Sequence, residues 1–120
     1  MQYMLLIYSD EKRWEALSTE DRGRLSAEYG SYTADMRDKG IFVEGAPLQT
    51  TATATSVQVR DGDNVVTDGP FAETKEQLGG YYVVEVPSLD EALDWASRMP
   101  SARFGTIEVR PVMSMEGAPQ

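Results

Sequence analysis

The sequence has 120 residues, of which 41% are hydrophobic and 26% charged, so it fits one ordinary globular domain with a single core. Its 20 acidic and 11 basic residues give a net charge of −9, which repels a phosphate backbone and argues against direct binding of nucleic acid. No apolar run approaches the roughly 18 residues of a membrane span, and no basic leader precedes the apolar start. We therefore expect a cytoplasmic protein without a membrane segment.

Cysteine and histidine are both absent from the sequence. The lack of cysteine excludes disulfides and thiolate nucleophiles, and the lack of histidine removes the commonest general base and the commonest metal ligand. We expect no cofactor and no dedicated metal site. Any catalysis must rely on carboxylates, tyrosines, lysines or arginines.

The N-terminal third predicts a strand followed by a long helix. Residues 3–9 are strongly apolar and alternate, as a strand does, and a polar loop is expected over 10–17. Ser18 is a candidate N-cap for a helix over 19–39, and Gly40 is placed to end that helix in the left-handed conformation. Four apolar residues of this helix are spaced so that they share one face, which must cover a sheet: Leu25, Tyr29, Tyr32 and Met36.

The middle of the chain predicts a short strand and a hairpin. The strand over 41–44 should stop at Gly45-Ala46-Pro47, because proline lacks the donor that a central strand requires. The threonine-rich run 50–55 is expected to be an extended lead-in. A hairpin is expected over 56–67, with its turn at 61–64.

The C-terminal half predicts a strand, a helix and a last strand. A long central strand is expected over 79–86, and the pair Ser88 and Glu91 forms a capping box at a helix start. That helix should end at Pro100, before a last strand over 105–112. Its expected buried stripe consists of Leu89, Ala92, Leu93 and Ala96.

This order of elements predicts an α+β fold, a ferredoxin-like split βαβ sandwich with a hairpin and short-helix insertion. We expect a single domain over 1–113 and a disordered tail over 114–120. If both helices cover one sheet face, the set Tyr81, Val83 and Glu85 lies on the other face, and it is too apolar for a freely solvated surface. A second subunit would cover it in a homodimer of the dimeric α+β barrel type, and an exposed amphipathic sheet is the alternative.

The run Asp68-Gly69-Pro70-Phe71-Ala72-Glu73-Thr74-Lys75-Glu76, here called the signature segment, has the residues of a helix start. Asp68 is an N-cap candidate, Pro70 suits the first turn, and Phe71 can anchor a short helix in the core. A capped turn explains these residue types without a substrate. The pair Gly79-Gly80 indicates a close approach, either by a ligand or by a neighbouring helix.

The signature segment, the start Met-x-Tyr-Met-Leu-Leu-Ile-Tyr and the ending over 105–112 resemble the YCII-related, or DGPF-domain, family over nearly the whole chain. This resemblance implies a fold similar to dimeric α+β barrel proteins. An enzymatic role has been suspected in the broader family from a histidine and aspartate pair, which cannot carry over to a chain without histidine. Only Asp68 transfers as a candidate catalytic residue, with Glu73 and Lys75 as weaker ligand-binding candidates.

Two functions remain open from the sequence. The first is a small-molecule binding or catalytic protein, whose cleft between the 19–39 helix and the sheet would be lined by Tyr8, Tyr29, Asp68 and Tyr81 or Tyr82. The second follows from the resemblance, because some family members look linked to extracytoplasmic-function sigma factors. In that case the chain is a non-catalytic accessory module that contacts its partner through acidic helix residues such as Glu20, Asp21 and Glu28.

Overall fold

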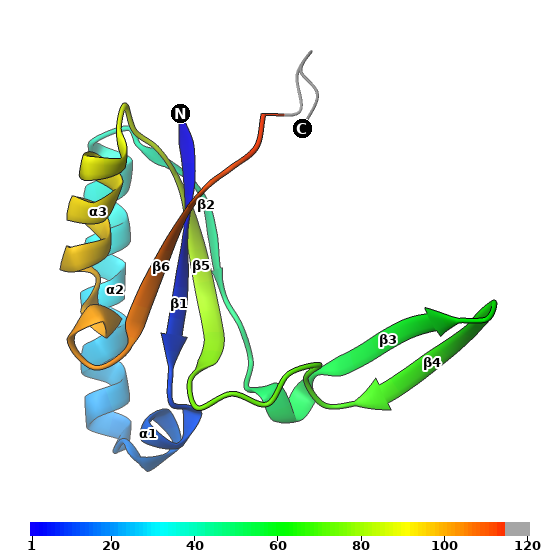
Figure 1. Ribbon diagram of the computed structural model, residues 1–120. Coiled ribbons are helices and arrows are strands. Elements are labelled where there is room, and N and C mark those ends of the chain that lie inside the picture. Colours follow the sequence, from blue (N-terminus) through cyan, green and yellow to red (C-terminus); the bar gives the residue numbers. More distant parts are fainter. Residues whose placement is uncertain (115–120) are drawn as a thin grey trace.

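The computed structural model describes residues 1–114 and has the expected α+β composition, with two antiparallel sheets (Figure 1). The strands are β1 Gln2–Ser9, β2 Phe42–Pro47, β3 Thr55–Arg60, β4 Asp63–Asp68, β5 Gln77–Glu85 and β6 Thr106–Pro111. The helices are α1 Glu11–Ala16, α2 Thr19–Asp38 and α3 Leu89–Arg98, with short 3-10 turns η1 Thr51–Thr53 and η2 Pro100–Arg103. The expected tail over 114–120 lies outside the described residues, apart from Ser114.

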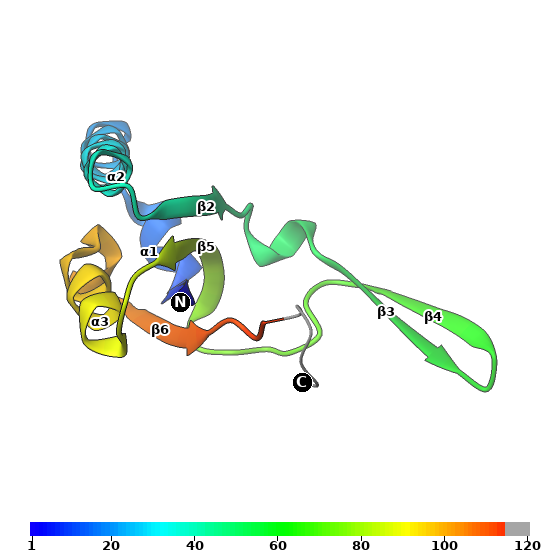
Figure 2. The ribbon, with the colours of Figure 1, turned by 90° about the horizontal axis from the view of Figure 1, so that it is seen from above.

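The main sheet has the strand order β2-β5-β1-β6, and each neighbouring pair is antiparallel. Helices α2 and α3 both lie on one face of this sheet (Figure 2). Strands β3 and β4 pair only with each other and form a hairpin that projects away from the body of the molecule (Figure 1). The fold is thus one layer of sheet, one layer of helix and a protruding arm.

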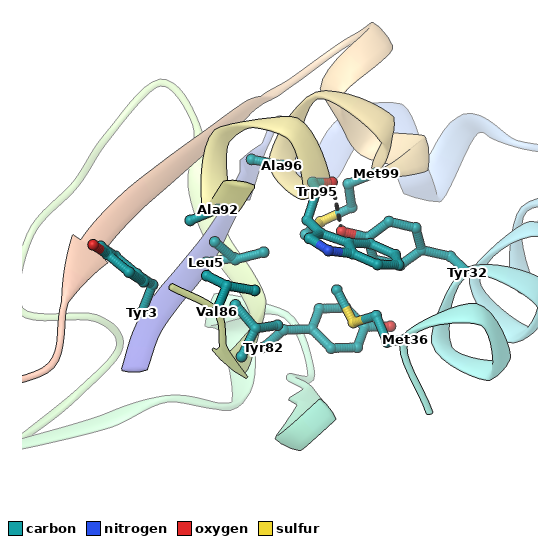
Figure 3. Packing of buried hydrophobic residues seen from close by; sticks show 11 residues of the cluster. Tyr3, Leu5, Tyr32, Met36, Tyr82, Val86, Ala92, Trp95, Ala96 and Met99 are labelled. Carbon is teal, nitrogen blue, oxygen red and sulfur yellow. Dashed lines mark hydrogen bonds between the residues drawn. The ribbon is translucent and has the colours of Figure 1, made fainter. Parts of the chain in front are cut away.

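The core lies between the sheet and the two helices (Figure 3). The pairing of Tyr3 with Val84 and of Leu5 with Tyr82 places these four side chains on the helix-covered face. Tyr32 of α2 contributes the main polar contact there, because its hydroxyl donates a 2.6 Å hydrogen bond to the carbonyl of Trp95. Its ring also meets those of Tyr82 and Trp95 edge to face. The remaining buried residues include Met36, Val86, Ala92, Ala96 and Met99.

Local signals at the helix ends are confirmed. The Ser18 hydroxyl accepts a hydrogen bond from the Asp21 amide at 3.1 Å, and the Ser88 hydroxyl accepts one from the Glu91 amide at 3.3 Å. Gly40 follows α2 with a φ of 71°, a conformation that favours glycine. Both long helices therefore begin where their capping residues predict, and α2 ends at the predicted glycine.

The prediction of a loop over residues 10–17 is wrong, because most of these residues form helix α1. The Asp10 carboxylate caps this helix by accepting from the Lys12 amide at 3.0 Å. Glu11 then ties the helix to the body: its amide donates to the Gln77 side chain at 2.9 Å, and its carboxylate accepts from the amide and hydroxyl of Thr51 at 2.6 and 2.8 Å. These long-range contacts, and not an apolar stripe, hold the short helix.

The end expected for β2 is also wrong, since the strand continues through Pro47. Because β2 is an edge strand, the missing proline donor costs no hydrogen bond within the sheet. The extended lead-in expected over 50–55 is interrupted by the 3-10 turn η1. The hairpin itself is confirmed, with Asp61 and Gly62 at positive φ in its two-residue turn.

The helix expected within the signature segment is absent, and residues 69–76 form neither helix nor strand. Asp68 is instead the last residue of β4, opposite Thr55, and the Gly69 amide donates to the Ala54 carbonyl at 2.7 Å. The chain therefore extends the hairpin where a helix start was predicted. Phe71 is 81% exposed and does not anchor the core.

Two of the four residues predicted to form the buried stripe of α3 are exposed. Leu89 and Leu93 are exposed, whereas Trp95 is buried together with Ala92 and Ala96. This orientation places the large indole against Tyr32, and it leaves the two leucines on the outer face.

Candidate functional site

A cavity of about 710 Å³ lies between α2, α1 and the edge of the sheet formed by β2 and β5. Apolar side chains make up much of its wall, with a few polar groups among them, as in sites for small molecules. Its size is also in the range of such sites. The lining includes Ile7, Trp14, Leu25, Ser26, Tyr29, Gly30, Thr33, Ala34, Phe42, Pro47, Leu48, Gly80, Tyr82 and Phe104.

Helix α2 leaves this space open because small residues face it. Ser26, Gly30 and Ala34 are spaced four apart, so they form one stripe of the helix. A side chain added at Gly30 would meet no atom within 4 Å of its Cβ. The adjacent stripe with Tyr32 and Met36 packs into the core. One side of α2 therefore holds the helix on the sheet, and the other bounds the cavity.

The sheet side of the cavity is formed where β2 and β5 approach each other closely. A Cβ added at Gly80 would lie 3.0 Å from the Ala46 carbonyl oxygen and 3.3 Å from the Pro47 Cα. The close approach predicted at Gly79-Gly80 is thus made by the neighbouring strand, and not by a helix.

Tyrosine hydroxyls connect the cavity wall to the rest of the fold. The Tyr29 and Ser101 hydroxyls share a hydrogen bond of 2.5 Å, and those of Tyr82 and Thr33 share one of 2.6 Å. Burial raises the pKa of Tyr29, and the hydrogen bond to Ser101 opposes this only in part. Tyr29 therefore stays protonated at neutral pH and offers a neutral polar group at the wall.

This pKa shift predicts a loss of stability in alkali. Because the folded state holds the Tyr29 proton more tightly than the unfolded state, the free energy of unfolding should fall as pH rises above about 10. In the Tyr29→Phe variant the free energy of unfolding should decrease less over this pH range, because the contribution of Tyr29 is absent. Urea denaturation of both proteins between neutral pH and pH ~11 measures the difference. Parallel curves would contradict the assigned cause.

Three charged residues line the cavity: Glu11, Arg13 and Arg37. Both carboxylate oxygens of Glu11 already accept hydrogen bonds from Thr51. The two arginines instead lie over aromatic rings, Arg13 at 4.3 Å from the centre of Phe104 and Arg37 at 4.1 Å from that of Phe42. Among residues 1–114 neither guanidinium has a carboxylate within ion-pair distance.

The structure separates the site residues predicted from sequence into two groups. Tyr29, Tyr81 and Tyr82 line the cavity, whereas Tyr8, Asp68, Glu73 and Lys75 are not part of its wall. Asp68 lies at the base of the projecting hairpin and is exposed. Although Tyr81 is among the lining residues, it pairs with Leu6, and this register places its side chain on the sheet face opposite the helices.

Several lining residues were not predicted from the sequence, including Arg13, Trp14, Phe42 and Phe104. Two of them come from the region that was expected to be a loop, and two stand at strand and turn ends. In the folded chain Arg13 stacks on Phe104, and Arg37 stacks on Phe42. The first of these contacts could not be predicted from the sequence, because Arg13 and Phe104 are far apart in the chain.

The acidic helix residues expected to contact a partner are paired within the chain. Arg24 bonds Glu20 at 3.2 Å and Asp21 at 3.1 Å, and Arg103 bonds Glu28 at 2.7 Å. These exposed pairs contribute little stability, but they reduce the negative charge of the surface.

No helix within residues 1–114 is long and apolar enough to cross a membrane. In the same part of the chain, no three Asp or Glu residues are grouped to hold a metal ion. The cavity offers one carboxylate and several hydroxyl and amide groups, which suit the binding of an organic molecule.

The comparisons with known proteins agree with the family resemblance of the signature segment. The sequence matches the YCII-related domain over residues 1–116, and the chain belongs to that family. It is also 39% identical over 114 residues to an uncharacterized protein of Rhizobium meliloti (strain 1021), which covers 93% of this chain and 92% of the relative. The class of protein is thus a YCII-related α+β domain.

Proposed function

We propose that this protein binds a small organic molecule in the cavity between α2 and the sheet. The observation that supports this most directly is Gly30, a glycine in the interior of a long helix with open space in front of it. Glycine at such a position costs about 0.5–1 kcal/mol relative to alanine, so a helix that only covered a core would gain from a larger residue. At Gly30, unlike Gly23 of the same helix, the open space belongs to the cavity, and a cavity that must remain open accounts for this glycine.

The geometry favours binding over acid–base catalysis within the cavity. Glu11 is the carboxylate in the wall, and both of its oxygens are engaged by Thr51. Tyr29 is held protonated, which suits a hydrogen-bonding group and not a base. A catalytic role for Asp68 would need a second site around the signature segment, since Asp68 lies outside the cavity wall.

We propose that the fold belongs to the ferredoxin-like class and that the protein is a homodimer of the α+β barrel type. The strand order β2-β5-β1-β6 and the placement of both helices on one face support the class. Met4, Leu6 and Tyr81 support the dimer, because these half-buried residues lie on the sheet face opposite α2 and α3. Light scattering should give twice the chain mass of 13.3 kDa. A single-chain mass at micromolar concentration would contradict the dimer.

The accessory role with a sigma factor is the alternative, and it has less support from the geometry. It requires a free acidic surface on α2, where Glu20, Asp21 and Glu28 are paired with arginines of the same chain. A sigma factor captured by the protein and released on reversal of these three charges would favour the alternative.

Tryptophan fluorescence tests the binding proposal. Trp14 lines the cavity and is 39% exposed, whereas Trp95 lies in the core and is 7% exposed. Filling the cavity with octan-1-ol, a neutral and largely apolar probe, should shift the emission of Trp14 to shorter wavelength in a saturable way. The Trp14→Phe variant should show no shift. A linear response, or an equal shift in Trp14→Phe, would contradict a binding site at this cavity.

A further inference from the structure

We infer that the molecule bound in this cavity is an amphipathic carboxylate, whose acidic group lies at the Arg13 end and whose apolar body extends along α2 toward Phe42. The inference rests on the proposed function and specifies its ligand. It follows from the distribution of charge, polarity and length in the cavity.

The charged residues of the cavity wall are mainly basic, whereas the chain as a whole is acidic. The protein carries a net charge of −9, yet two of the three charged residues at the cavity are arginines. Because Thr51 occupies the Glu11 carboxylate, an anion beside Arg13 would meet a cation, and among residues 1–114 the wall presents no free carboxylate to oppose it. An anionic ligand is therefore favoured over a cationic one.

Four polar side chains gather at one end of the cavity. Ser9, Gln49, Thr50 and Gln77 line the cavity where α1 docks, and the contact of the Glu11 amide with Gln77 fixes that docking. Arg13 lies at this end, above Phe104. The Phe104 ring supports one face of the Arg13 guanidinium, and the N–H groups at the edge of the guanidinium remain able to donate hydrogen bonds to a carboxylate.

The other part of the cavity is elongated and mainly apolar, with the hydroxyls of Ser26 and Thr33 and the guanidinium of Arg37 as its polar groups. The lining residues of α2 run from Leu25 to Arg37, a length of about 18 Å along the helix. The wall between these ends carries Tyr29, Ala34 and Phe42 together with the backbone of β2. Such a channel suits a chain or a flat apolar body better than a compact polar metabolite.

Three eight-carbon probes of equal length test the inference: octanoate, octan-1-ol and octylamine, each titrated against the emission of Trp14. Octanoate should bind at least about tenfold more tightly than octan-1-ol, because a charge-assisted hydrogen bond in a half-buried site contributes that much or more. Octylamine, which is cationic at neutral pH, should bind more weakly than either.

Arg13→Gln should lower the affinity for octanoate about tenfold and change that for octan-1-ol less than twofold. Arg110→Gln is the matched control, since Arg110 is an exposed arginine of β6 that does not line the cavity, and it should alter neither affinity. Saturable binding in which octan-1-ol or octylamine equals octanoate would overturn the inference and leave the proposed function standing. Absence of saturable binding by all three probes would overturn both.

Discussion

Replacing Gly30 with phenylalanine should lower the affinity of the protein for octan-1-ol at least tenfold. The new ring would project from α2 into the cavity, where no atom lies within 4 Å of the added Cβ, so it would occupy the space of the ligand without a clash. Because glycine is unfavourable inside a helix, the free energy of unfolding should rise by up to about 1 kcal/mol at the same time. Tryptophan fluorescence gives the affinity, and urea denaturation gives the stability.

Gly23 supplies the control for this experiment. It lies seven residues before Gly30, on the same stripe of α2, and it also has open space at its Cβ, but it does not line the cavity. Gly23→Phe should raise stability as Gly30→Phe does and leave the affinity unchanged. If the two variants bind octan-1-ol equally well, the cavity is not the binding site.

Gly105→Ala should destabilise the protein by about 3 kcal/mol, the upper range for overpacking a tight site. A Cβ at this position would collide with the carbonyl oxygen of Tyr8, and it would lie 3.0 Å from the Ser9 Cβ and 3.2 Å from the Ser101 carbonyl oxygen. Two of these neighbours are backbone atoms, which cannot move without separating β6 from β1. Urea denaturation should therefore give a markedly lower midpoint with an unchanged slope.

Gly79→Ala is the comparison, because the nearest atom to its added Cβ is the Ile7 carbonyl oxygen at 3.9 Å, an ordinary contact. That variant should change stability by less than about 1 kcal/mol. Equal stabilities of Gly105→Ala and Gly79→Ala would show that β1 and β6 do not approach as closely as described.

The parts of the fold that were predicted correctly depend on neighbours in the sequence. The caps at Ser18 and Ser88 need only an oxygen and an amide three residues later, and Gly40 needs only a left-handed turn. The hairpin turn at Asp61-Gly62 is equally local. Such features are the same before and after the chain folds, so the sequence is sufficient to identify them.

The parts that were predicted incorrectly depend on contacts between distant segments. Asp68 has the chemistry of a helix cap, but pairing with Thr55 extends the hairpin ladder to it. In α3, the spacing of Leu89 and Leu93 fits a buried stripe as well as that of Trp95 does, and the contact of Trp95 with Tyr32 decides between them. Neither outcome could be obtained from one segment alone.

The candidate site was predicted only in part for the same reason. Tyr29 lines a cavity beside α2, a position that follows from an amphipathic helix on a sheet. Arg13 and Phe104 are brought together by the docking of α1, and α1 was itself predicted to be a loop. A site assembled from such segments cannot be identified before the fold is known.

The most direct test of the account is the position of a bound probe on the protein. Intermolecular nuclear Overhauser effects between octan-1-ol and isotopically labelled protein should connect the probe to ring protons of Trp14, Tyr29 and Phe42, which line the cavity. Contacts to Met4 on the sheet face opposite the helices, or to Val66 on the hairpin, in place of those three rings would contradict it.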